Sequence, residues 1–177
     1  RVVPPRSARR KAGRAVAVGA AGPAGRAAAP QLTRAGDAVT VFERADRSGG
    51  LLRDGIPEFK MEKRHLERRI VQMEAEGTTF RTSVNVGVDI TAAELREQFD
   101  AVVLAGGATN WRDLPLPGRE FNGIYQAMEY LPPSNRVQDG DLAESPITPA
   151  GKHVAIIRRG GRSPAGPGSR HPPAAPP

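Results

Sequence analysis

The sequence predicts an incomplete α/β domain with a parallel sheet, flanked by disordered basic tails. Three observations predict this fold. Short apolar runs alternate with helical patterns along the middle of the chain, an order typical of parallel sheets. Glycines follow the first apolar run at once, as they do where a buried strand enters a tight turn. Residues 164–177 are dense in proline and have no apolar periodicity, which predicts disorder.

The expected elements alternate along the chain. The apolar run over 15–18 predicts a buried strand, the alanine-rich stretch 23–35 a helix that ends near Gly36, and 38–42 a second strand. Apolar residues at helical spacing predict a helix over 60–76, which stops at the following glycine. The remaining expected elements are an extended segment over 79–88, a helix over 91–99 with a capping box of Thr91 and Glu94, and strands over 101–104 and 154–157.

Composition excludes several kinds of site. The chain has no cysteine, which excludes disulfides, cysteine nucleophiles and thiolate ligands for metals or iron–sulfur clusters. No apolar run approaches the roughly 20 residues that a membrane span needs. No apolar stretch near the N-terminus resembles a signal peptide. We therefore expect a soluble, cytoplasmic protein without membrane partners.

The net charge of +7 comes wholly from the two ends of the chain. Residues 1–14 carry six basic side chains and 158–177 carry four, with no acid in either segment. Removing these ten from the 26 basic residues leaves 16 against 19 acidic residues, so the middle has a net charge of −3. The charged run over 62–69 is expected to be a solvated helix face. A basic-tailed nucleic-acid binder is therefore the weakest alternative function, because no folded basic surface is predicted.

The stretch 15–25 carries the main chemical signal, because a strand runs into glycines and then into a helix. A dinucleotide site needs such a turn to present backbone N–H groups to a pyrophosphate at a helix N-terminus. Gly22 permits close backbone approach, and Gly25 lets the helix pack near the strand. Ala20 stands where the usual pattern has glycine, at a cost of about 1 kcal/mol if its φ is positive. The alternative is a glycine-rich turn without a ligand.

Glu43 supports the dinucleotide interpretation, because it follows the second strand of the same unit. A carboxylate there can accept both hydroxyls of an adenosine ribose and would repel a 2′-phosphate, which favours FAD or NAD over NADP. The alternative is a solvated acid at a strand end. Two further glycine-containing stretches, 47–57 and 99–108, can bring backbone close to the same ligand. Together these features predict a Rossmann-like domain.

Six stretches in one register resemble a known family. They are GPAG at 22–25, VTVFER at 39–44, GGLLRDGIPEFKMEK at 49–63, VNVGVDIT at 84–91, DAVVLAGGA at 100–108 and LPLPGRE at 114–120. Together they are similar to the small (beta) subunit of bacterial NADPH-dependent glutamate synthase. The resemblance covers about residues 14–157, and the GIPEFKMEK stretch is much more specific than the glycine motif.

The resemblance implies a flavoprotein whose FAD domain contains an inserted NADPH domain. Such a protein takes hydride from NADPH onto FAD and passes electrons, through iron–sulfur clusters, to a large subunit that makes glutamate. Carried over by position, the FAD-binding residues would be Gly22, Ala24 and Gly25 at the pyrophosphate, Glu43 at the ribose, Gly50, Leu51 and Arg53 on the flavin side, Val86 at the adenine, and Ala105, Gly106 and Gly107 closing the site.

The resemblance also implies domain bounds. We expect a disordered basic tail over 1–13, a partial FAD/NAD(P)-binding Rossmann-like domain over 14–150, the first strand of a truncated NADPH-binding domain over 151–157, and a disordered tail over 158–177. The family register is lost after Ile157, so we expect the NADPH site to be absent and interpret the tail as a frameshift product or gene fragment. We expect no iron–sulfur ligands in this chain.

Departures from the family lie in the glycine turn, in the first helix and at Asp54, which replaces an aromatic residue of the family. Arg26 puts a charge where an apolar residue should pack, and Pro30 should kink the helix. With Ala20, they predict weak or no FAD retention. Two alternatives stay open: an oxidoreductase by inheritance, and a catalytically inactive fragment that holds a dinucleotide or docks on the large subunit.

Overall fold

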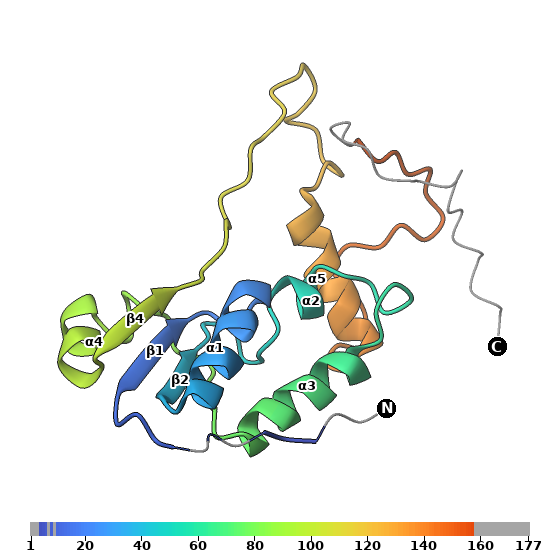
Figure 1. The fold of residues 1–177 in the computed structure, drawn as a ribbon. Helices are drawn as coiled ribbons and strands as arrows, with labels where there is room; N and C mark the ends of the chain where they lie inside the picture. Colours follow the sequence, from blue (N-terminus) through green and yellow to red (C-terminus); the bar gives the residue numbers. More distant parts are fainter. Residues whose placement is uncertain (1–3, 7, 9, 158–177) are drawn as a thin grey trace.

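The computed structural model describes residues 4–6, 8 and 10–157, and the predicted tail over 158–177 lies outside the described residues. The fold is the predicted α/β arrangement, with one four-stranded parallel sheet in the order β3-β2-β1-β4. Figure 1 shows β4, β1 and β2 side by side, with α1 and α3 on one side of the sheet. The strands are β1 (Ala15–Gly19), β2 (Ala38–Phe42), β3 (Thr79–Arg81) and β4 (Ala101–Leu104).

The helices include all those expected and two that were not. The helices are α1 (Pro23–Ala35), α2 (Leu51–Asp54), α3 (Lys63–Ala75), α4 (Ala92–Gln98) and α5 (Ala127–Gln138). The capping box of Thr91 and Glu94 at the start of α4 is formed as predicted. Helices α2 and α5 were not predicted, because α2 has a single turn and α5 contains two prolines. The strand predicted over 154–157 is not formed; these residues are exposed and pair with no strand in the described part of the chain.

The core lies on both faces of the sheet. One cluster joins Val18 and Val41 of the strands to Ala29 of α1 and Met73 of α3. The other joins Ala17 and Phe42 to Ile90 and to Leu95 of α4. Because the two β1 neighbours Ala17 and Val18 point to opposite faces, β1 and β2 are covered on both sides, whereas the edge strand β4 is largely exposed. This double cover holds the carboxyl ends of β1 and β2 in place.

Two segments outside the sheet are tied to helices or helix ends. In the predicted N-terminal tail, the Arg6 N–H donates to Glu76 at 3.1 Å and the Ala12 N–H donates to the Gly36 carbonyl at 2.8 Å. After β4 the chain runs away from the sheet and returns as α5, which lies beside α2 (Figure 1). Asn135 of α5 is buried, and its side-chain amide donates to the Asp54 carbonyl at 2.8 Å.

Candidate dinucleotide site

The turn between β1 and α1 has the geometry of a phosphate-binding turn. Gly22 is the N-cap residue of α1, and no side-chain oxygen caps this helix end. A Cβ built on Gly22 would meet nothing within 4 Å, so the helix N-terminus faces open space. A Cβ on Gly25 would lie 1.9 Å from the Ala20 carbonyl oxygen, so only glycine allows α1 to pack this close to the turn. The free N–H groups and the helix dipole favour an anion here.

Ala20 carries the strain that its sequence position predicted. Its φ is 95°, in the left-handed region where a Cβ is unfavourable. Its N–H donates to the Phe42 carbonyl at 2.7 Å, which fixes the turn to the end of β2. The positive φ on which the expected backbone cost depends is therefore present.

The Glu43 side chain is buried and points to the glycine turn. One carboxylate oxygen accepts the Ala21 N–H at 2.8 Å, and the other accepts the Ala45 N–H at 3.0 Å. Its residue exposure is 7%, so these bonds hold the carboxylate in one orientation. Each oxygen retains a second lone pair, which can accept a ligand hydroxyl. The acid at the end of β2 and the turn after β1 therefore lie together, as a dinucleotide site requires.

The paired glycines after β2 also lie at this turn. A Cβ built on Gly50, whose φ is 51°, would lie 2.9 Å from the Cα of Gly22. On the other side of the segment, a Cβ on Gly49 would lie 2.8 Å from Leu66 of α3. The segment is thus packed between the phosphate turn and α3. This is a close approach of two backbones that side chains would prevent.

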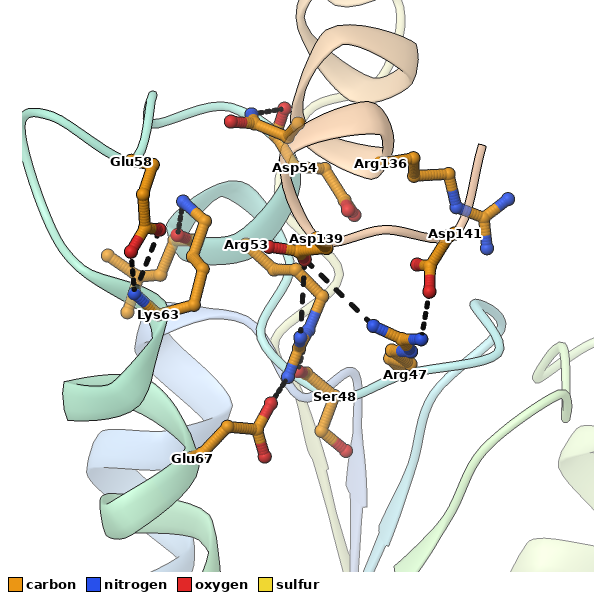
Figure 2. Close-up of polar contacts among 12 residues, drawn as sticks. Arg47, Ser48, Arg53, Asp54, Glu58, Lys63, Glu67, Arg136, Asp139 and Asp141 are labelled. Atoms are coloured by element: carbon orange, nitrogen blue, oxygen red, sulfur yellow. Dashed lines mark hydrogen bonds and ion pairs between the residues drawn. The ribbon is translucent and has the colours of Figure 1, made fainter. Parts of the chain in front are cut away.

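Arg53 of α2 is buried in a cluster of charged side chains (Figure 2). Its Nε donates to the Ser48 carbonyl at 2.9 Å, and its guanidinium pairs with Glu67 of α3. A second carboxylate, that of Asp139 after α5, lies 3.8 Å from its Nη1. The guanidinium is thus engaged by protein groups next to the glycine pair.

The other residues carried over from the family lie at or near the same edge. Ala24 is exposed in the first turn of α1, and Leu51 is 54% exposed at the start of α2. Val86 forms a parallel bridge with Ile90 on the α4 side of the sheet. The Ala105 N–H donates to the Gly19 carbonyl at 2.9 Å, directly after β4. The two exposed glycines that follow leave open space around their Cα atoms: Gly106 and Gly107.

Arg26 is buried in part against α3 and α2 and is poorly accommodated. Its Nε and Nη1 are inaccessible to solvent and have no hydrogen-bond partner within the described ranges. Burial lowers the pKa of Arg26, and the nearby guanidinium groups of Arg69 and Arg53 lower it further. The sequence predicted that a charge at this position would be unfavourable, and the structure shows how.

Lys63 was expected on a solvated helix face, and that expectation is wrong for this residue. Lys63 is only 6% exposed, and its Nζ donates to the Leu52 carbonyl at 3.1 Å and to the Ile56 carbonyl. Burial lowers the pKa of Lys63. Its aliphatic stem and ammonium group fasten α2 to α3, so Lys63 supports the segment after the glycine pair. Asn135 and Asp139, which also support α2, carried no local signal in the sequence.

The described part of the chain holds neither a metal-binding cluster nor a membrane-spanning helix. No group of three or more acidic or histidine side chains is placed to hold a metal ion. Among the helices from α1 to α5, none combines the length and the apolarity of a membrane span.

A parallel sheet whose first strand enters a glycine turn, with an acid after the second strand, defines the Rossmann-like class of dinucleotide-binding folds. The fold matches that of FprA, a Mycobacterium tuberculosis oxidoreductase solved in complex with NADPH. The match has a TM-score of 0.59 and 28% identity, and covers 67% of this chain and 28% of that chain. No family model matches the chain.

The sequence comparison identifies particular relatives. A Mycobacterium tuberculosis protein named glutamate synthase [NADPH] small chain is 65% identical over 163 residues, covering 89% of this chain and 33% of the relative. The Bacillus subtilis protein of the same name is 48% identical, over 89% of this chain and 32% of the relative. The chain is therefore a homologue of the glutamate synthase small chain and spans about a third of its length. The resemblance found in the sequence is confirmed.

Proposed function

We propose that this chain forms the FAD-binding part of a glutamate synthase small chain, an NADPH-dependent flavoprotein oxidoreductase. The observation that carries the proposal is the convergence of Glu43 and the Gly22 turn at one sheet edge. The residues present fit the ADP half of FAD. The N-terminus of α1 has no side-chain cap, and a Cβ built on its N-cap residue Gly22 would meet nothing within 4 Å, so a ligand can come close to the backbone there. When bound, the flavin accepts hydride and passes electrons on.

In this proposal, the chain's own residues bind the dinucleotide and hold it in one orientation. Backbone N–H groups at Ala24 and Gly25 hold the pyrophosphate at the start of α1. The Glu43 carboxylate accepts the ribose hydroxyls while its bonds to Ala21 and Ala45 keep it in place. The exposed edge formed by Leu51, Gly106 and Gly107 lies where the rest of the ligand would extend.

The activity that we propose for the whole protein is based on the names of its relatives. A small chain of glutamate synthase [NADPH] implies a large subunit as partner and NADPH as reductant, and both are part of this proposal. In this proposal residues 14–150 form the FAD-binding domain and the residues from 151 onward lead into the NADPH domain. We propose no nucleic-acid partner for the basic ends of the chain.

A titration of FAD into the purified chain, followed by quenching of flavin fluorescence, tests the site. We expect saturable binding of low affinity, because Ala20 and Arg26 disturb the turn and helix at the pyrophosphate. ADP should displace the FAD and 2′-phosphorylated ADP should not, because Glu43 repels a 2′-phosphate. Glu43→Gln removes that repulsion and should narrow the difference between the two competitors. The exposed Glu97, on the far side of the sheet, gives the matched control Glu97→Gln. Absence of FAD binding by the folded chain would overturn the proposal.

A second candidate is a chain that holds the dinucleotide without turnover. The strained Ala20 and the unsatisfied Arg26 favour it, because both lie in the turn and helix that would bind the pyrophosphate. NADPH-dependent reduction of ferricyanide separates the two candidates: the oxidoreductase reduces the acceptor when FAD is supplied, whereas the inactive chain binds FAD and reduces nothing.

A further inference from the structure

Residues after α5 form ion pairs with the segment that follows β2 (Figure 2). The Asp139 carboxylate lies between two guanidinium groups, 3.8 Å from Arg53 Nη1 and 3.9 Å from Arg47 Nη1. Asp141 pairs with the other terminal nitrogen of Arg47, Nη2, and Arg136 pairs with Asp46. The C-terminal end of α5 is therefore held against residues 46–53 by charge.

Arg53 connects this cluster to the glycine pair. Its Nε hydrogen bond to the Ser48 carbonyl fixes the residue before Gly49. Its Cβ lies 3.0 Å from the position that a Cβ on Gly49 would occupy. Gly50 in turn packs on Gly22, the N-cap of the phosphate turn. A continuous set of contacts thus runs from Asp139 to the helix end that would bind the pyrophosphate.

Asp139 is the less exposed of the two carboxylates that lie at Arg53. The Arg53 side chain is 8% exposed and that of Asp139 is 15% exposed, whereas Glu67, the other acid on Arg53, is 51% exposed. Arg26 and Arg53 also lie close enough to repel each other. Removing Asp139 leaves the buried Arg53 guanidinium with Glu67, which is half exposed, as its remaining counter-ion, so less of the buried charge is compensated. Without Asp139, we expect Arg53 to turn toward the exposed Glu67 and its hydrogen bond to the Ser48 carbonyl to weaken.

We propose that Asp139 is a positioning residue for the dinucleotide site, which holds residues 48–50 against Gly22 through Arg53. The consequence for FAD affinity rests on the proposed function; the positioning itself does not. Asp141 provides a matched control, because it pairs with Arg47 but not with Arg53.

Hydrogen–deuterium exchange of the full chain, without and with FAD, tests the proposal. Asp139→Asn should speed exchange of the amides over 48–54 by about tenfold. The same variant should leave the β1 and β2 amides unchanged, and Asp141→Asn should leave both regions unchanged. Asp139→Glu restores the carboxylate and should recover most of the protection. In the FAD titration, Asp139→Asn should weaken binding while Asp141→Asn does not.

Three results would overturn the positioning role: unchanged exchange over 48–54, equal effects of Asp139→Asn and Asp141→Asn, or a uniform rise that includes β1 and β2. The uniform rise would mean that Asp139 supports only global stability. Failure of the proposed function is distinguishable, because a chain that binds no FAD still reports the local exchange of residues 48–54.

Discussion

Gly50 lies so close to Gly22 that a Cβ on Gly50 would come within 2.9 Å of the Gly22 Cα. Gly50→Ala must therefore separate the two backbones or strain its own φ of 51°. We expect a loss of about 2 kcal/mol in the free energy of unfolding and weaker FAD binding. Urea denaturation measures the first effect. Gly106→Ala is the control, because its Cβ meets nothing within 4 Å; an equal loss there would contradict the interpretation.

Ala20→Gly is expected to stabilise the chain. Ala20 has a φ of 95°, which glycine adopts without the Cβ penalty. The gain in the free energy of unfolding should be about 1 kcal/mol. Ala27→Gly, at an exposed position of α1, should have the opposite sign because glycine is a poorer helix former. A destabilising effect of Ala20→Gly would show that the turn is not strained.

Arg26→Leu is also expected to stabilise the chain, because it removes two buried nitrogens that have no partner within the described ranges. Relief of the desolvation cost should add about 2 kcal/mol to the free energy of unfolding. Arg68→Leu on the exposed face of α3 is the matched control and should change it little. Thermal and urea unfolding of both variants provide the measurement. A large loss in Arg26→Leu would mean that the guanidinium has a partner that stabilises the fold.

The Glu76 carboxylate should make stability depend on pH. Its side chain is fully buried; burial opposes ionisation, but hydrogen bonds from Arg34, the Arg6 N–H and Gln72 outweigh it and lower the pKa of Glu76 below 4.5. A group whose pKa is lower in the folded state stabilises the protein above its unfolded pKa and loses that contribution as pH falls through its folded pKa. Glu76→Gln should therefore cost about 2 kcal/mol at pH 7, and less below pH 4.5.

Urea unfolding of the wild type and Glu76→Gln across this pH range measures the difference. The exposed Glu97→Gln variant corrects for general effects of losing one carboxylate. A difference between wild type and Glu76→Gln that grows as the pH falls would contradict the assigned direction of the pKa shift.

Several elements were predictable because local pattern specifies them. Helix α1 ends where Gly36 permits a left-handed cap, and α4 begins at the predicted capping box of Thr91. The apolar runs became β1, β2 and β4. β1 and β2 are covered on both faces, so no polar alternation obscures their pattern. β4 lies at the edge of the sheet and is largely exposed, which its apolar run did not predict. The extended segment over 79–88 formed only the short strand β3, because the backbone leaves the extended conformation at Ser83, whose φ is 55°.

The glycine spacing, the acid at position 43 and the motifs shared with the glutamate synthase small chain were legible along the chain, because each is a short-range pattern. The docking of α5 on α2 and the burial of Lys63, Arg53 and Asp139 were not. Those features depend on which charges meet across contacts between residues far apart in sequence, and no local periodicity encodes the pairing. Folding therefore brings the Asp139 carboxylate, which is distant in sequence, close to the segment with Gly49 and Gly50, which the local sequence pattern had identified.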